Sequence, residues 1–581
     1  MNNKKPQQSF QYNTVPTSDN TQNTLFLEKG RLIVPIIFIP GVMGSNLMEK
    51  TGKLDSKIVW RLDSPLSVLG WALPHYGNAK ARKLELAPDK TTVDDRGEII
   101  EASDDASDRK VAQIKHHYDT QLHLLGNDKS RQNEVRQLKR ERRQKIDEAI
   151  KNTTENRLFG SRQERGWGTV GFYSYGKFLN ELQTSLFDQR GRIPAKINEL
   201  VNKSPLFSLD DGAKTTLFFE DDKDIEHCKQ FYFPVHAMGY NWLKSNEDSA
   251  MALKELVDVT LPRYYQKRGK FYGKVIIITH SMGGLVSRCY TQALGGEDKV
   301  LGVIHGVQPA TGAVAAYTRM KRGTEVNTGF FGKPKAVITE NVLGKDAAEM
   351  TTVCAQAPGP LQLLPTPEYG KGWLTITAPD GKVESYPKSE PYQEIYLAKD
   401  KWWCACEPHL INPLNSDHNE EQMKVDWKEY ENIIKYKVKT FNSAIANQYH
   451  PNTYAFFGIE NKKPIKMSAL TYQTAQWQGK PISSHKVPPK NHIGDQRRLN
   501  LKELKGRRTL KDGDISEKYT LLPADGNGDG TVPQHSGEIP IKYLTARMHF
   551  SVEHEPAYQK DKSQDFTLRA IIDIVKKVPL A

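Results

Sequence analysis

Short runs of apolar residues alternate with longer amphipathic stretches along this chain. The runs at residues 31–39 (RLIVPIIFI) and 275–279 (VIIIT) are rich in β-branched residues, and a glycine-containing turn follows each of them. Runs of this length and composition are typical of strands that are buried on both faces of a sheet. Both segments are therefore predicted to be core strands.

Strand patterns and helix patterns then succeed one another through the rest of the chain. This alternation predicts an α/β fold with a mostly parallel sheet and helices on both of its faces. The predicted strands lie near residues 231–243, 274–279, 300–307 and 452–459, and the predicted helices near 247–266, after 281, and at 427–445 and 563–577.

The remaining patterns divide the chain into a core and several excursions. Residues 107–153 predict two charged helices around a GND turn, and for the basic run of the second helix a solvated surface is favoured over a lipid- or partner-binding patch. The expected parts are a disordered tail (1–30), the first part of the core (31–100), an inserted helical hairpin (101–160) and the core with the nucleophile (161–340). A cap- or lid-like insertion with a helix (341–450) and the end of the core (451–581) follow. The last part contains a Lys/Arg-rich excursion with little regular structure (461–519).

Composition narrows the class of protein. Of the 581 residues, 38% are hydrophobic, and 82 Lys and Arg against 69 Asp and Glu give a net charge of +13, which favours phosphate-bearing surfaces. No nucleic-acid-binding motif accompanies that charge, so nucleic acid is not an expected partner. No apolar run approaches the roughly 18 to 20 residues that span a bilayer, and the N-terminus carries no secretion signal. The five cysteines match neither a disulfide framework nor a zinc site, so no cofactor is expected.

The sequence THSMGG at residues 279–284 is a candidate nucleophile elbow. A tight turn between a strand and a helix needs small residues two before and two after the serine, and Thr279 and Gly283 occupy those positions around Ser281. Thr279 departs from the usual glycine but is small. A serine that only caps a helix is the alternative, and the strand before and the helix after favour the nucleophile. This predicts an α/β-hydrolase fold with Ser281 as its nucleophile.

The acid of a catalytic triad is expected in DGNGDGTVP, residues 525–533. Asp529 is preferred to Asp525 as the carboxylate that orients the base. Asp525, Asn527 and Asp529 also imitate the first half of a calcium-binding loop, but the twelfth position is Ser536 rather than glutamate. An EF-hand is therefore not expected, and a calcium site of another kind stays open.

Three histidines follow that acid and could act as the base. His554 lies in the polar loop EHEPAY before the last helix, where this fold presents its base, whereas His549 is flanked by apolar residues and His535 lies close to the acid loop. His554 is preferred. The expected oxyanion donors are the backbone N–H groups of Met282, which follows the nucleophile, and of Val42 in PGVMGS.

These motifs together resemble a known group of lipases. PGVMGS, HSMGG and GDGTVP resemble the lipases related to lecithin:cholesterol acyltransferase and GPI inositol-deacylase, and GYNWL, APGPLQLLPTPEYG and EHEPAY add a likeness to antibacterial phospholipase effectors of bacterial type VI secretion systems. The resemblance implies hydrolysis of acyl esters in membrane glycerophospholipids, toxicity to a competing cell and a cognate immunity protein. It also implies a secretion-spike (VgrG-type) or adaptor partner, synthesis in the bacterial cytoplasm and delivery into the target cell.

Two other functions fit the same residues. A soluble carboxylesterase would use the same triad on small esters, and a hydrolase fold kept for binding would use the insertions instead. Residues 60–73 and the segment around Leu361 to Leu364 could wall the acyl site or fill the core.

Overall fold

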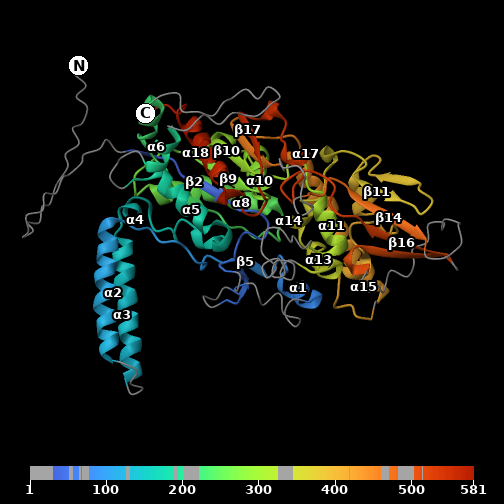
Figure 1. The fold of residues 1–581 in the computed structure, drawn as a ribbon, viewed down its shortest axis with the longest axis horizontal. Helices are drawn as coiled ribbons and strands as arrows, with labels where there is room; N and C mark the ends of the chain where they lie inside the picture. The colour runs from blue at the N-terminus through green and yellow to red at the C-terminus, as the bar shows by residue number, and fades with distance from the viewer. Residues whose placement is uncertain are drawn as a thin grey trace, which may run out of the picture.

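A six-stranded parallel sheet forms the centre of the computed structural model (Figure 1). Its strands follow the order β17-β13-β10-β9-β2-β7, and every neighbouring pair is parallel. The strands are β2 (Ile36–Ile39), β7 (Val235–Ala237), β9 (Val275–His280), β10 (Val300–Gly306), β13 (Thr453–Gly458) and β17 (Ala546–Phe550). The structure describes residues 31–51, 56–64, 67, 78–125, 131–188, 194–201, 222–324, 344–417, 419–459, 470–481, 503–512 and 515–580.

Helices cover both faces of this sheet. The continuous apolar strands at its centre require this, because their side chains are buried on both sides. In β2, Ile36 and Phe38 point into the core that contains α5 (Phe172–Leu186) and α18 (Asp561–Val575). Ile37 and Ile39 of the same strand point into a second core with α8 (Asn246–Glu255) and α10 (Gly283–Arg288). A strand with apolar residues at every position is stable only between two such layers. The predicted α/β-hydrolase architecture is confirmed.

A second sheet of five strands lies beside this core, at the right of Figure 1. Its order is β12-β11-β14-β16-β15, with bounds Val383–Tyr386, Leu374–Thr377, Ala475–Pro481, Ile515–Leu521 and Arg507–Asp512. The expectation of little regular structure between 461 and 519 is therefore wrong for the described residues of that segment. One face of these strands is strongly polar, so the alternation of apolar and polar residues is hard to recognise in the sequence. On the other face Trp477, Leu510 and Tyr519 point into a third core. Residues 461–469, 482–502 and 513–514 lie outside the described part.

A long helical hairpin projects from the body, at the lower left of Figure 1. It consists of α2 (Asp105–Leu125) and α3 (Gln132–Lys151), which pack against each other. The short helix α4 (Thr154–Phe159) follows and joins the hairpin to the core. The expected N-terminal tail lies outside the described residues.

Hydropathy along the described helices leaves no membrane span. None of them combines the length and the apolar character that crossing a bilayer requires.

Candidate active site

Ser281 lies on a strained turn between β9 and α10. Its φ of 51° is in the left-handed region, which a residue with a side chain rarely adopts. A Cβ atom on Gly283 would lie 2.5 Å from the carbonyl oxygen of Ile39 and 2.6 Å from that of Pro40, so the close approach of β2 requires glycine here. The turn thus has the geometry of a nucleophile elbow.

Thr279, the departure from the usual motif, is accommodated by a hydrogen bond. Its side chain is fully buried, and its Oγ1 lies 2.8 Å from Nδ1 of His305 on the neighbouring strand β10. The hydroxyl therefore has a partner inside the sheet, and the position tolerates a small polar side chain.

A hydrogen-bonded chain joins the three predicted triad residues. His554 Nε2 lies 2.8 Å from Ser281 Oγ, and His554 Nδ1 lies 2.8 Å from Asp529 Oδ2. The other oxygen of Asp529 accepts the backbone N–H groups of Thr531 and Val532 at 2.9 and 2.7 Å. Because the carboxylate can only accept a hydrogen bond, Nδ1 of His554 carries the proton and donates it. Nε2 is then left bare and can accept the proton of Ser281.

The acid and the base are also held to each other through the backbone. The N–H of His554 donates to the carbonyl of Asp529 at 2.9 Å. A Cβ atom on Gly458, the last residue of β13, would lie 2.5 Å from Cβ of Asp529, so the glycine lets the acid loop approach the end of the sheet. Asp529 and Ser281 are 5% and 3% exposed, which shields their hydrogen bonds from water.

The other candidates for the acid and the base make contacts away from Ser281. Asp525 accepts the backbone N–H groups of Gln473 and Thr474, both at 3.0 Å, and so ties the acid loop to the segment that leads into β14. The ring of His535 packs on Tyr369 with centroids 4.3 Å apart, and the ring of His549 lies 5.6 Å from Phe457. None of these three side chains contacts the Ser281 hydroxyl.

The oxygens of the possible calcium site are likewise committed to protein donors. Asn527 Oδ1 accepts the N–H of Gly528 at 2.9 Å, beside the hydrogen bonds of Asp525 and Asp529 described above. Across the described ranges, no group of three or more His, Cys, Asp or Glu side chains could hold a metal ion.

The turn after β2 packs directly against the elbow. A Cβ atom on Gly41 would lie 2.8 Å from Nδ1 of His280 and 3.1 Å from Cβ of Ser281. Val42 follows Gly41, and Met282 follows the serine at the start of α10. In the described part of the chain neither of these two backbone N–H groups donates to a protein acceptor, so both are free to bind a substrate oxygen.

The buried apolar residues of the two candidate acyl walls belong to hydrophobic cores. Trp60 is 1% exposed, donates its indole N–H to the carbonyl of Met43 at 2.8 Å and packs on Trp242. Leu361 and Leu364 lie in the core under the second sheet. Residues 65–66 and 68–73 of the first candidate lie outside the described part.

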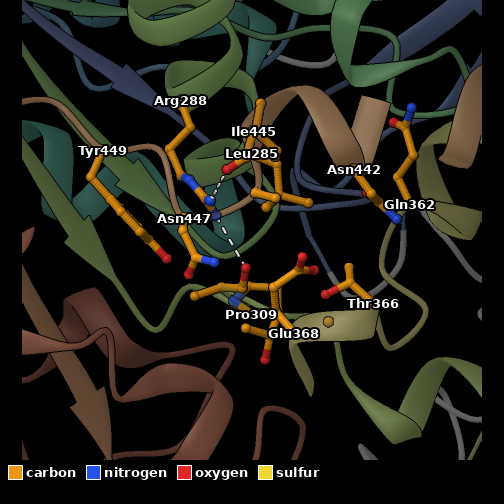
Figure 2. Close-up of a pocket in the computed structure, with 14 residues that line it drawn as sticks. Leu285, Arg288, Pro309, Gln362, Thr366, Glu368, Asn442, Ile445, Asn447 and Tyr449 are labelled. Atoms are coloured by element: carbon orange, nitrogen blue, oxygen red, sulfur yellow. Dashed lines mark hydrogen bonds between the residues drawn. The ribbon is translucent and has the colours of Figure 1, made fainter. Parts of the chain in front are cut away.

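A small cavity beside α10 is separate from the triad. Its volume is about 20 Å³, and Leu285 and Arg288 of α10 contribute to its lining (Figure 2). The buried guanidinium of Arg288 donates to the carbonyls of Gln448 at 2.9 Å, Ala310 at 3.1 Å and Ile445. The cavity has room for about one water molecule. We therefore assign Arg288 to anchoring α10 and not to substrate binding.

One protein-family model matches the greater part of this chain. The family model described as "Lecithin:cholesterol acyltransferase" matches residues 232–567, more than half of the chain. This chain belongs to the lecithin:cholesterol acyltransferase family. Ser281, Asp529 and His554 all fall within the match, whereas Val42 lies before it. The expected kinship with lecithin:cholesterol acyltransferase-like lipases is confirmed.

A solved structure is similar to this family member over nearly its whole length. "The crystal structure of Tle4-Tli4 complex" contains a chain that is 25% identical, with a TM-score of 0.67, and the similarity covers 94% of this chain and 99% of that one. No curated protein matches the sequence. The solved structure therefore extends the likeness beyond the residues that the family model matches.

Two polar residues beside the triad were not singled out from the sequence. Tyr175 of α5 and His280 of β9 are 4% and 3% exposed and hydrogen-bond to each other at 2.9 Å. His280 is visible in the elbow motif as the neighbour of the serine. Nothing in the sequence connects it to Tyr175, because the contact spans α5 and the central sheet.

Proposed function

We propose that this chain is a serine phospholipase that hydrolyses acyl ester bonds of membrane glycerophospholipids. The observation that carries the proposal is the hydrogen-bonded chain from Ser281 through His554 to Asp529 on a strained turn at the end of β9. A hydroxyl in contact with an imidazole that a carboxylate orients is the arrangement that activates serine for attack on an ester.

In the proposed reaction His554 transfers two protons, one in each half of the reaction. Nε2 takes the proton of Ser281 as Oγ bonds to the acyl carbonyl carbon, and the N–H groups of Met282 and Val42 bind the oxygen that becomes negative. The ester bond then breaks, and the same proton passes from Nε2 to the departing lysophospholipid oxygen. A water molecule then gives a proton to His554 as its oxygen attacks the acyl-enzyme, and His554 passes this proton to Ser281 as the fatty acid leaves. Asp529 keeps its charge throughout and stabilises the imidazolium.

Family membership and charge support phospholipid as the substrate. The family name describes an enzyme that acts on lecithin. The net charge of +13 would attract the chain to anionic headgroups. We therefore favour a phospholipase over a soluble carboxylesterase or a binding protein.

We further propose that the chain is an antibacterial effector of a type VI secretion system with a cognate immunity protein. The support is the motif resemblance together with the similarity to the Tle4–Tli4 structure, which is a complex of two proteins. A secretion spike of the VgrG type, or an adaptor, is the expected delivery partner from the resemblance alone.

The decisive experiment compares fatty-acid release from mixed phospholipid vesicles by the wild type and by Ser281→Ala. We expect the variant to lose activity by a factor of about 10³ or more, because the triad acts as a unit. Ser287→Ala is the matched control, since Ser287 is also buried on α10 but its hydroxyl donates to the carbonyl of Gly284. It should retain most of the release.

Each other outcome points to a different conclusion. Equal release by Ser281→Ala and the wild type would reject the assigned nucleophile. Hydrolysis of short soluble esters without any release from vesicles would identify a carboxylesterase. Directing both forms to the periplasm of a susceptible bacterium tests the toxin role, since only the wild type should stop growth.

A further inference from the structure

We infer that Tyr175 and His280 form a neutral hydrogen-bonded bridge that positions the oxyanion turn and the base loop of the active site relative to each other. Both are positioning residues, and the inference rests on the proposed function. It assigns a role to the residue that immediately precedes the nucleophile and to a tyrosine on α5, a helix outside the predicted motifs.

The bridge consists of three consecutive contacts. The backbone N–H of Gly41 lies 3.2 Å from Tyr175 Oη, which lies 2.9 Å from His280 Nδ1. On the other side of the imidazole, His280 Nε2 lies 2.8 Å from the carbonyl oxygen of His554. The path therefore begins one residue before a predicted oxyanion donor, Val42, and ends on the residue that carries the base.

The chemistry of the end groups determines the direction of every hydrogen bond. A carbonyl oxygen can only accept, so Nε2 of His280 carries the proton and donates it to His554. Nδ1 is then bare and accepts from the Tyr175 hydroxyl. That hydroxyl in turn accepts from the Gly41 N–H. Each donor has one acceptor, so the bridge has a single consistent arrangement of protons.

Burial keeps this arrangement neutral. Burial, and next the nearby charge of His554, lower the pKa of His280 to about 3, and burial raises the pKa of Tyr175. Tyr558 also lies beside His280, with ring centroids 6.1 Å apart, and burial raises its pKa. Glu555, the residue after His554, accepts from the Ser174 hydroxyl at 2.6 Å, and burial raises its pKa as well. The bridge thus fixes geometry without placing a second positive charge beside the imidazolium that His554 becomes during attack.

This arrangement would act on the transition state more than on substrate binding. The position of His554 matters when the serine proton moves, and the position of Val42 matters when the carbonyl oxygen becomes negative. Tyr175 and His280 touch neither the reacting atoms nor the three triad side chains through their own hydrogen bonds. Loosening the bridge should therefore lower kcat and leave KM nearly unchanged.

The test is a double-mutant cycle on the full-length protein with a soluble nitrophenyl ester and with phosphatidylglycerol vesicles. We expect Tyr175→Phe to lower kcat by about fivefold to tenfold, the effect of losing one buried hydrogen bond. His280→Gln should lower kcat at least as much. The double variant should be no worse than His280→Gln alone, because both substitutions interrupt one bridge.

The pH profile and a matched tyrosine separate positioning from general loss of structure. Because the bridge is neutral, Tyr175→Phe should lower the plateau of the kcat profile without moving its acid limb. Tyr454→Phe is the control, since Tyr454 is fully buried at the amino end of β13 and its hydroxyl bonds Asp573. It should lower the urea midpoint while kcat stays within about twofold.

Additive losses in the double variant, or a fall in stability with unchanged kcat, would overturn the bridge. An acid limb that moves in Tyr175→Phe would also overturn it, because a neutral bridge cannot produce that shift. A wild type that releases no fatty acid, or a Ser281→Ala variant as active as the wild type, would instead reject the proposed function.

Discussion

Ser281 shows how a single residue combines local strain with tertiary support. Its left-handed backbone is unfavourable for a serine, and it persists because β2 and the turn at Gly41 close around it.

Two buried histidines near Ser281 make the stability of the fold depend on pH. Burial removes the water around His280 and His305 and lowers the pKa of both. At low pH the unfolded chain binds protons that these residues do not bind in the folded state, and this favours unfolding.

We predict that acid destabilises the fold through these histidines. Burial, followed by the positive charge of Arg288, lowers the pKa of His305 from 6.5 to about 3. Between those values the unfolded chain binds a proton that the folded chain does not, so the free energy of unfolding rises with pH. The slope is up to about 1.4 kcal/mol per pH unit for each such histidine. In urea unfolding at pH 5, 6 and 7, His305→Gln should show a smaller slope than the wild type, and an unchanged slope would contradict this assignment.

The helical hairpin shows how an element with little apolar surface is fixed to the body. Glu155 of α4 accepts two hydrogen bonds from Arg162, at 2.9 and 3.0 Å, and another from Arg165. Arg165 also donates to the side-chain oxygen of Gln183 on α5 at 2.6 Å and to the carbonyl of Val235 on β7 at 3.1 Å. The base of the hairpin is therefore joined to the central sheet by buried charges.

We predict that Glu155→Ala lowers the free energy of unfolding by about 3–5 kcal/mol, because it leaves buried guanidinium groups unpaired. Glu148→Ala is the control. It removes the partner of Lys145 at 3.3 Å on the exposed face of α3 and should cost less than about 1 kcal/mol. Urea unfolding curves measure both, and equal effects would mean that the buried network does not stabilise the junction.

At the scale of the whole molecule, the hairpin presents a row of basic side chains on its second helix, α3. Arg136, Lys139, Arg140 and Arg143 are exposed. Each of the four lies three or four residues from two others of the set, so they share one face of α3. None of the four forms an ion pair within the described part of the chain. The sequence alone favours a solvated surface for this run. Under the proposed function the same face would also meet an anionic bilayer, and we propose that it binds one.

We predict that replacing these four residues with glutamine weakens binding to phosphatidylglycerol vesicles by about tenfold or more, since each basic residue near such a surface contributes about 1 kcal/mol. Vesicle sedimentation at low and high salt measures this binding, and binding of the variant should depend less on salt than binding of the wild type. Turnover of a soluble ester should stay unchanged. Wild-type binding that is equally strong on neutral phosphatidylcholine would contradict the electrostatic attraction.

Local patterns in the sequence determined a large part of this protein. The buried strands, the two helices of the hairpin and the turn around Ser281 follow from periodicity and turn chemistry, which act over a few residues. The fold class follows from their alternation along the chain. The second sheet escaped prediction because strands with one strongly polar face resemble a basic loop until their partners are known.

Tertiary structure alone decided which distant groups meet. Three histidines and two aspartates were candidates, and only the order of strands in the central sheet brings His554 and Asp529 to the end of β9 beside Ser281. The contact of Tyr175 with His280 depends in the same way on how α5 packs over that sheet. The number of residues between two loops does not give their distance in space, because the packing of the layers that hold the loops sets that distance.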